Sequence, residues 1–294
     1  MPSLKDIRLR IKSVQTTQQT TRAMKMVAAS KLRRAQDTIV QFRPYANKLG
    51  ELQRNLVAAA GSDVTSEYAE VRETKNVLLV VITSNRGLCG AFNTAIIKLA
   101  QTAAEIQYAD LLRNGNVKFL CLGKKGYDYF KKRGVPVISD DFDVFSKLGF
   151  DSVNAVAESV LQGFRDGEWD KVVLFYNAFK NIATQIRTEE ALLPASAQAD
   201  PSGAAALSSD YLYEPDQTQI LQRLVPQILK TRFYKAVLES NASEHGARMF
   251  AMDQATENAE ALVKELRLTF NKARQAAITK EILEIVGGAD ALSS

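Results

Sequence analysis

Apolar residues recur in alternating steps of three and four along the first 56 residues. The series runs from Leu4 to Leu56 in one register, and twelve of its sixteen positions are apolar. This spacing places one apolar stripe on one helix face and is typical of a coiled coil. It predicts a helix of about 55 residues, roughly 80 Å long. We expect Pro44 to bend or kink this helix, and Gly61 and Ser62 to end it.

The carboxyl-terminal end shows the same spacing, most clearly over residues 252–277. The pattern predicts a helix over about residues 216–286, roughly 105 Å long, with a bend near Pro226 and an end at Gly287 and Gly288. Both stripes are rich in alanine, so the two backbones can approach closely. We expect the two terminal helices to pair with each other in an antiparallel arrangement.

Three polar residues interrupt the amino-terminal stripe. Gln18, Thr21 and Lys25 occupy successive stripe positions. A tightly paired helix is not expected to place three polar groups in a row on its buried face. We therefore expect this third of the helix to face more than one partner, or to be only loosely paired.

The middle of the chain has a different pattern. Continuous apolar runs rich in β-branched residues predict buried parallel strands, and their alternation with helical segments predicts an α/β sheet with crossover connections. The segment 194–209 is small, polar and punctuated by Pro and Gly, which indicates a loop. The expected strands are residues 76–83, 117–122, 171–177 and 184–193, with a short extended piece at 135–138; the expected helices are about 91–109, a short one ending at Arg133, and 152–166.

Together these patterns predict an α/β fold combined with a coiled coil. A long antiparallel coiled coil of the N- and C-terminal helices should carry an inserted, Rossmann-like α/β domain. The expected divisions are an amino-terminal helix over 1–60, an α/β domain over 74–195, and a carboxyl-terminal helix over 210–294 that pairs with the first.

The sequence shows no constellation that predicts catalysis. The turn Arg86–Gly90 follows a strand, but it has the form G-x-x-G and lacks the Gly-Lys-Ser/Thr ending of a phosphate-binding loop. No nucleophile and base are paired, and His245, in a charged helical stretch, is interpreted as a surface or interface residue. Cys89 and Cys121 are interpreted as buried, unpaired thiols. We expect no catalytic residues, no cofactor and no metal.

The charge is unevenly distributed. Residues 1–60 contain twelve Lys/Arg and three Asp/Glu, a net charge of +9 against +5 for the whole chain. A basic segment of this kind meets an acidic partner or is simply a solvated face, and the sequence leaves both open. A nucleic-acid-binding coiled coil is one rival, although residues 1–41 contain no aromatic residue for stacking. An α/β enzyme with a coiled-coil arm is the other.

The far carboxyl terminus is apolar. Seven of its last thirteen residues, from 282 to 294, are Ile, Leu, Val or Ala. This helix should exceed its partner by roughly 15 residues, so about 20 Å should project beyond the pair. An exposed apolar tip is unfavourable in water, so insertion into another protein is the preferred interpretation, with folding back onto the chain as the alternative. The chain contains no apolar run of about 18 residues, so no membrane span is expected.

Several motifs resemble one family along the whole chain. The stretch Ile278–Ala291 is similar to the signature I-T-x-E-x-x-E-x-x-x-G-A-x-A of the gamma subunit of F-type ATP synthases. The other motifs that resemble this family are Asn271–Ala276, Ala23–Lys31, Arg86–Gly90 and Tyr211–Pro215. The chain has no cysteine-containing regulatory insert of the kind that chloroplast members carry, so thiol switching of that kind is not expected. An amino terminus without a transit pattern and the stretch Asp210–Pro215 (DYLYEP) favour a bacterial member.

The resemblance implies a non-catalytic rotor. In this family the paired helices form the central shaft inside a ring of alpha and beta subunits, and the base meets the epsilon subunit and the membrane-embedded c ring. It implies contacts to the beta subunit by Arg22, Met24, Lys25, Lys31, Arg274, Gln275, Thr279 and Glu281; contacts to the c ring by Tyr211, Tyr213 and Glu214; and an apolar tip of Ile282, Ile285, Val286 and Leu292 inside an alpha/beta sleeve. Nucleic acid is not an expected partner, and the implied location is the cytoplasmic face of a bacterial inner membrane.

Overall fold

The computed structural model describes residues 3–60, 67–138, 142–145, 148–195 and 217–293. Its contacts divide the chain into two compact units. The helix-pair unit consists of Met1–Ala28 and Met249–Ser294, and the α/β unit consists of Ala29–Arg248. Both long helices contribute to both units.

The two terminal helices are α1, Leu4–Ala60, and α6, Gln217–Ser293. They contain 57 and 77 residues and continue through their internal prolines, Pro44 and Pro226. The predicted end of α6 at Gly287 and Gly288 is wrong, because the helix runs on to Ser293. Each glycine costs only about 1 kcal/mol relative to alanine, and an established helix propagates through such a cost when helix-forming residues follow.

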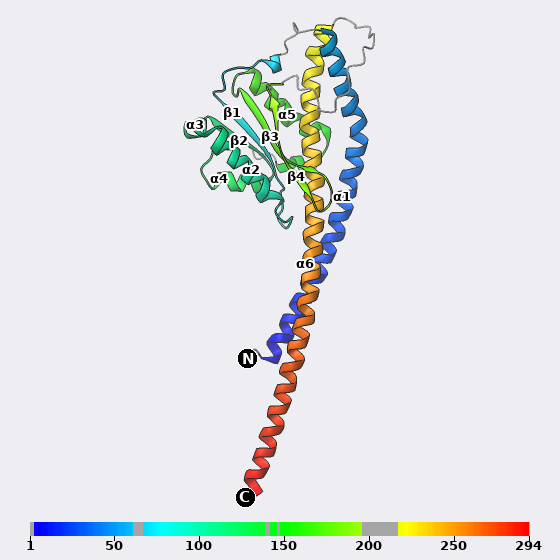
Figure 1. Ribbon diagram of the computed structural model, residues 1–294, viewed down its shortest axis with the longest axis vertical. Helices are drawn as coiled ribbons and strands as arrows, with labels where there is room; N and C mark the ends of the chain where they lie inside the picture. Colours follow the sequence, from blue (N-terminus) through cyan, green and yellow to red (C-terminus); the bar gives the residue numbers. More distant parts are fainter. Residues whose placement is uncertain (1–2, 61–66, 139–141, 146–147, 196–216, 294) are drawn as a thin grey trace. The chain divides into compact units, whose positions relative to one another are not determined.

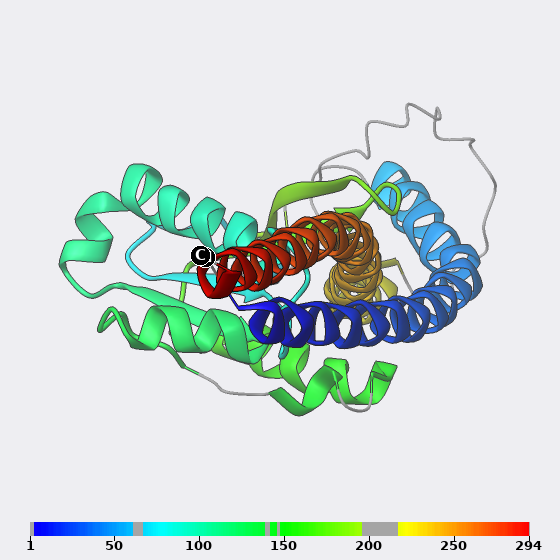
Figure 2. The same ribbon diagram turned by 90° about the horizontal axis from the view of Figure 1, so that it is seen from below.

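The predicted stripe is confirmed along α1. Every stripe position from Leu4 to Leu49 is buried or half-buried, and most positions between them are exposed. In the helix-pair unit, residues further along α1 contact residues that come earlier in α6. The Arg8 guanidinium lies 5.5 Å from the centroid of the Phe270 ring, and Thr21 contacts Thr256. The pairing is therefore antiparallel, as predicted, and within the helix-pair unit the dark-blue start of α1 and the orange-to-red part of α6 lie side by side (Figures 1 and 2).

The α/β unit contains a four-stranded sheet of order β2-β1-β3-β4. Strands β1, Val77–Ile82, β2, Val117–Leu122, and β3, Lys171–Phe179, are parallel, whereas β4, Gln185–Leu193, runs antiparallel to β3. These four strands match the predicted ones to within two residues. The extended piece near Val137 forms only an isolated bridge to Phe119.

Shorter helices connect the strands. They are α2, Phe92–Gln107, α3, Ala109–Arg113, α4, Lys124–Lys131, and α5, Phe150–Arg165, with 3-10 turns at Glu67–Ala69 and Phe142–Phe145. The single helix expected over 91–109 is broken at Tyr108, whose φ of −129° and ψ of 30° leave the helical region. The Tyr108 side chain is buried in the core, so packing overrides local helix propensity at this position.

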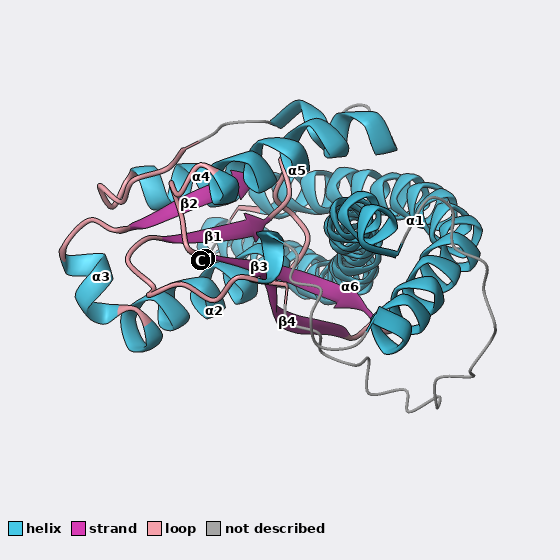
Figure 3. Ribbon diagram, turned by 90° about the horizontal axis from the view of Figure 1, so that it is seen from above, coloured by secondary structure: helices cyan, strands magenta, loops and turns pink. Residues whose placement is uncertain are grey.

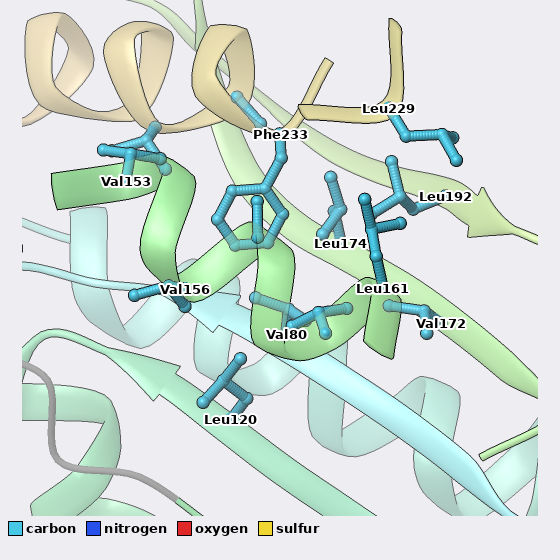
Figure 4. Packing of buried hydrophobic residues seen from close by; sticks show 14 of the residues in the cluster. Val80, Leu120, Val153, Val156, Leu161, Val172, Leu174, Leu192, Leu229 and Phe233 are labelled. Atoms are coloured by element: carbon cyan, nitrogen blue, oxygen red, sulfur yellow. The ribbon is translucent and has the colours of Figure 1, made fainter. Parts of the chain in front are cut away.

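The sheet is covered on both faces, which explains why β1 is buried at every position. One face packs against α2 through Ile96, Ile97 and Ala100. The opposite face packs against α5 and α6, and Figure 4 shows Phe233 of α6 pointing onto this face. Figure 3 shows α2 and α5 on opposite sides of the strands. The amino-terminal half of α6 is thus part of the core of the α/β unit.

Candidate partner-binding surfaces

The four predicted beta-facing residues of α1 have different environments. Arg22 and Lys31 are exposed, whereas Met24 and Lys25 are half-buried. Lys31 belongs to the α/β unit, and the other three belong to the helix-pair unit. In the helix-pair unit Arg22 is therefore the member of this group whose charge is most open to a partner.

Loose pairing, one of the two alternatives expected for the polar interruption of the stripe, is wrong at Thr21 and Lys25. Thr21 is only 9 % exposed, and its Oγ1 lies 2.8 Å from Oγ1 of Thr256. The Lys25 Nζ forms an ion pair with Asp253 Oδ1 at 2.5 Å. Thr21 and Lys25 thus each meet a polar residue of α6, which removes the cost of burying an unpaired polar group at these two positions.

The four predicted beta-facing residues of α6 form a separate surface. Arg274, Gln275, Thr279 and Glu281 are all exposed, and the Thr279 hydroxyl donates to the Gln275 carbonyl at 2.9 Å. Lys25 lies opposite Asp253, about 21 residues before Arg274, which corresponds to roughly 32 Å along α6. The two groups therefore form two sites at different heights on the helix pair.

The predicted apolar tip is exposed in the chain. Ile282, Ile285 and Val286 are 54 %, 72 % and 52 % exposed, and the Leu292 side chain lies outside the described side chains. Because Arg8 faces Phe270, the first residue of α1 lies near Arg274, and about 19 residues of α6 continue past it, roughly 28 Å. Figure 1 shows this extension as the red end of α6. The predicted c-ring residues Tyr211, Tyr213 and Glu214 lie outside the described residues.

The glycine turn after β1 is held by its own side chains. The Ser84 hydroxyl donates to the Arg86 carbonyl at 2.6 Å, and the Asn93 side chain donates to the Ser84 hydroxyl at 2.7 Å. Cys89 is buried within this network, and Gly90 adopts a positive φ of 59°. The turn is thus tight, and side chains next to it form hydrogen bonds with its backbone and with each other. This is in keeping with the sequence, which lacks the ending of a phosphate-binding loop.

Leu88 in this turn was missed by sequence reasoning. It has a φ of 62° and is 64 % exposed. A left-handed conformation is unfavourable for a residue with a branched side chain, by about 1–2 kcal/mol, and persists only where the surroundings impose it. The exposed apolar side chain is a candidate contact for a partner.

A charged cluster on α6 fixes the same turn from the other side. Arg248 pairs with Glu244 at 2.6 Å and donates to the carbonyls of Arg86 at 3.1 Å and Gly87 at 3.4 Å. Burial raises the pKa of Glu244, although the adjacent Arg248 opposes this. Sequence inspection shows the i, i+4 spacing of this pair but cannot show that the turn lies against it.

His245 is more buried than the sequence interpretation assumed. Burial, with the cations Arg248 and Lys31 nearby, lowers its pKa to about 4. The imidazole is therefore neutral at physiological pH. Its closest polar contact is the Arg248 guanidinium, at 3.4 Å from Nδ1.

An aromatic cavity lies between α1, α5 and α6 in the α/β unit. Its volume is about 470 Å³, and it is lined by Thr38, Gln41, Phe42, Tyr45, Phe150 and Tyr234. The rings of Phe42 and Phe150 meet that of Tyr234 edge-on, with centroids 5.0 Å and 5.4 Å apart. Phe42 is a predicted stripe residue, but the cavity depends on α5 and was not predicted.

Two features are missing from the described parts of the chain: a cluster of metal ligands and a helix able to span a membrane. No three His, Cys, Asp or Glu side chains there are grouped as metal ligands would be. Nor does any described helix combine the length and the apolar character needed to cross a membrane.

The fold and these surfaces define a class of proteins in which helices from both chain ends pair antiparallel and carry an α/β domain inserted between them. A family model described as "ATP synthase" matches residues 3–292. The ATP synthase gamma chain of Cytophaga hutchinsonii is 50% identical over the full length of both chains, and that of Chlorobaculum tepidum is 49% identical over 99% of each. The chain belongs to the gamma chain family of the ATP synthases.

Solved structures show the same architecture. A chain of the central stalk and c ring of the Tetrahymena thermophila mitochondrial ATP synthase is 27% identical, with a TM-score of 0.58 over 80% of this chain and 99% of that one. A chain of the Euglena gracilis mitochondrial enzyme reaches a TM-score of 0.66 at 22% identity, covering 98% of this chain and 94% of that one. The second likeness bears on the fold alone.

Proposed function

We propose that the chain is the central rotor shaft of an F-type ATP synthase. In this role it is a non-catalytic subunit that couples ion-driven rotation of the c ring to conformational change at the alpha/beta catalytic sites. The observation that carries the proposal is the extension of α6 beyond α1, together with membership in the gamma chain family. A helix that leaves its own partner and stays apolar needs a protein sleeve around it.

The tip is the part that enters the sleeve. Ile282, Ile285 and Val286 are exposed on α6, and Leu292 follows them in sequence. An apolar sleeve of alpha and beta subunits would remove these side chains from water without ion pairs that oppose turning. Rotation would then proceed against a weakly directional surface, because apolar contacts lack the geometric demands of hydrogen bonds.

Two groups of residues would transmit force to the beta subunits. The first is Arg22, Met24, Lys25 and Lys31 on α1, and the second is Arg274, Gln275, Thr279 and Glu281 on α6. Their separation along the shaft supports contacts with two different parts of a beta subunit. The net charge of +9 over residues 1–60 favours acidic partner loops and steers their encounter.

The other end of the shaft would rest on the membrane sector. Tyr211, Tyr213 and Glu214 are proposed to contact the c ring, and the epsilon subunit is proposed to bind beside them. Attachment to the membrane would be peripheral, through the c ring, at the cytoplasmic face of a bacterial inner membrane. The Tetrahymena structure, described as a central stalk and c ring, supports this arrangement by its likeness to the chain.

Co-purification tests the proposal directly. A tagged chain expressed in its own cells should elute with a large ATPase whose activity is coupled to ion pumping. Elution of the chain alone, with the ATPase in other fractions, would contradict the proposal.

Deletion of the residues after Ile282 tests the sleeve. We expect weaker coupling or weaker assembly, whereas the α/β unit should stay folded because its core lies in residues 29–248. Normal assembly and normal coupling of the truncated chain would refute the role of the tip. Circular dichroism of the truncated chain separates these outcomes from general unfolding.

A further inference from the structure

The helix-pair unit contains one polar layer in an otherwise largely apolar stripe. It consists of Thr21 and Lys25 on α1 and of Thr256 and Asp253 on α6. On one side of this layer lies Ala28; on the other, beyond the half-buried Gln18, lie Val14 and Val263, which are also buried or half-buried. Apart from Gln18, the layer is therefore flanked along the helix axis by apolar residues.

The two threonine hydroxyls meet across the interface of the helix pair. Both hydroxyls lie near a backbone acceptor of their own helix, Gln18 O at 3.0 Å for Thr21 and Met252 O at 2.7 Å for Thr256. Each hydroxyl has one hydrogen, so at the 2.8 Å contact one threonine donates across the interface and the other donates to its own helix. This arrangement requires the two side chains to be directly opposite.

Three contacts share one antiparallel register. The pairs Arg8 with Phe270, Thr21 with Thr256 and Lys25 with Asp253 have residue numbers that sum to 277 or 278. A shift by one heptad towards the carboxyl end of α6 would place Thr21 opposite Val263, Thr256 opposite Ala28 and Asp253 opposite Leu32. Three of the four polar groups would then face apolar residues, and Lys25 alone would meet another charge, that of Glu260. Most of the remaining stripe residues of this unit, apart from Gln18 and Phe270, are aliphatic and would tolerate such a shift far better.

We propose that this polar layer fixes the register at which the amino-terminal segment of α1 lies on α6, and that Lys25, instead of contacting the beta subunit itself, acts through Asp253 within the chain. A single polar position in an apolar seam is a well-attested way to specify register. One heptad of slippage would move the tip by about 10 Å relative to α1. In a shaft, such a displacement would misplace both the tip and Arg22; this consequence for coupling, unlike the register itself, rests on the proposed function.

Charge exchange tests how Lys25 acts. In the assembled complex, Lys25→Glu and Asp253→Lys should each lower the number of ions pumped per ATP hydrolysed at least twofold, and the double variant should return to within about 1.5-fold of wild type. A double variant no better than the worse single variant would show that Lys25 acts on a partner, and would overturn the proposal. Lys264→Glu, at the exposed pair Glu260–Lys264 of the same unit, is the matched control for charge reversal.

Cysteine cross-linking tests the register without any reference to coupling. In the full-length chain, Val14→Cys with Val263→Cys should form a disulfide, and Val14→Cys with Phe270→Cys, shifted by one heptad, should not. When the layer is made apolar by Thr21→Val, Lys25→Leu, Asp253→Leu and Thr256→Val, the shifted pair should reach at least a tenth of the yield of the first pair.

The outcomes separate the register proposal from the proposed function. An apolar layer that still gives only the first disulfide would show that the remaining stripe sets the register alone, and would refute the proposal. A chain that never associates with an ATPase would remove the proposed function but leave the cross-linking result valid.

Discussion

Arg248 and Glu244 lie one turn apart on α6, with Nη1 and Oε1 separated by 2.6 Å and with side chains only 12 % and 11 % exposed. The same guanidinium donates through Nη2 to the carbonyls of Arg86 and Gly87. One buried cation therefore ties the long helix to the glycine turn. Within the α/β unit this contact links the start of α2 to α6, two segments more than 150 residues apart in sequence.

Arg248→Ala should destabilise the chain by about 3–5 kcal/mol, because it leaves the Glu244 carboxylate buried without its partner. Denaturant unfolding of the chain measures this loss. Lys264→Ala is the matched control: Lys264 pairs with Glu260 at the same i, i+4 spacing, but the pair is exposed and its removal should cost no more than about 0.5 kcal/mol. Equal costs at the two positions would contradict the buried pair.

Gly163→Ala should destabilise the chain by about 1–3 kcal/mol or more. Alanine normally improves a helix interior, but a Cβ at Gly163 of α5 would overlap the ring of Trp169, whose Nε1 donates to the Val160 carbonyl at 2.9 Å. Thermal unfolding measures the change. Gly115→Ala is the comparison, because no atom lies within 4 Å of that Cβ and only the positive φ of 75° opposes it. A stabilised Gly163 variant would mean that the Trp169 ring moves aside freely.

The features predicted from sequence are those that a local pattern determines. The stripe from Leu4 to Leu49 and the four strands follow from spacing and residue type alone, and the structure confirms them. The contact of Thr21 with Thr256 joins residues 235 positions apart, so spacing on α1 could not reveal that its polar positions are matched. Leu88 was missed for a related reason: it has a left-handed backbone in a turn whose carbonyls accept hydrogen bonds from Ser84 and from the distant Arg248, and spacing along the chain does not show these contacts.

The stability of the chain should depend on the protonation of His245. Its pKa is about 4 in the folded chain and 6.5 without the fold, so the unfolded chain takes up a proton first as the pH falls. The contribution of neutral His245 is therefore fully present above about pH 6.5 and is lost as the pH falls towards about 4. Between about pH 7.5 and about pH 5 the loss should be about 1 kcal/mol, after allowance for the partial exposure of the ring.

His245→Asn isolates this contribution. The neighbouring Glu244, whose pKa is raised by burial, acts with the opposite sign, because the folded chain binds its proton more readily. Since Glu244 is present in both proteins, the difference in melting temperature between wild type and variant should change with pH through His245 alone. A difference that stays constant over this range would show that His245 titrates normally in the folded chain.

Ile285→Asp tests the tip without shortening the helix. Ile285 is 72 % exposed, so the substitution should change the free energy of unfolding of the chain by less than about 0.5 kcal/mol. Within an apolar sleeve, however, the carboxylate would be desolvated, and coupling or assembly should fall markedly. Ile106→Asp on α2 is the control, because Ile106 is 75 % exposed in the α/β unit and should affect neither property. Normal assembly and coupling of the Ile285 variant would argue against the sleeve.

Leu88→Gly should change stability and partner binding in opposite directions. Glycine adopts a φ of 62° without strain, which should stabilise the folded chain by about 1–2 kcal/mol. The greater conformational freedom of glycine in the unfolded chain should reduce this gain in stability by about 0.5–1 kcal/mol. The chain should therefore melt at a higher temperature.

If the exposed leucine side chain contacts a partner in the ATP synthase, the same substitution should weaken coupling, because the contact is lost. Leu88→Asn separates the two effects: asparagine tolerates the left-handed region but replaces the apolar surface with a polar one, so it should weaken coupling with a smaller gain in stability. Higher stability with unchanged coupling in both variants would show that Leu88 is strained without a role in partner binding.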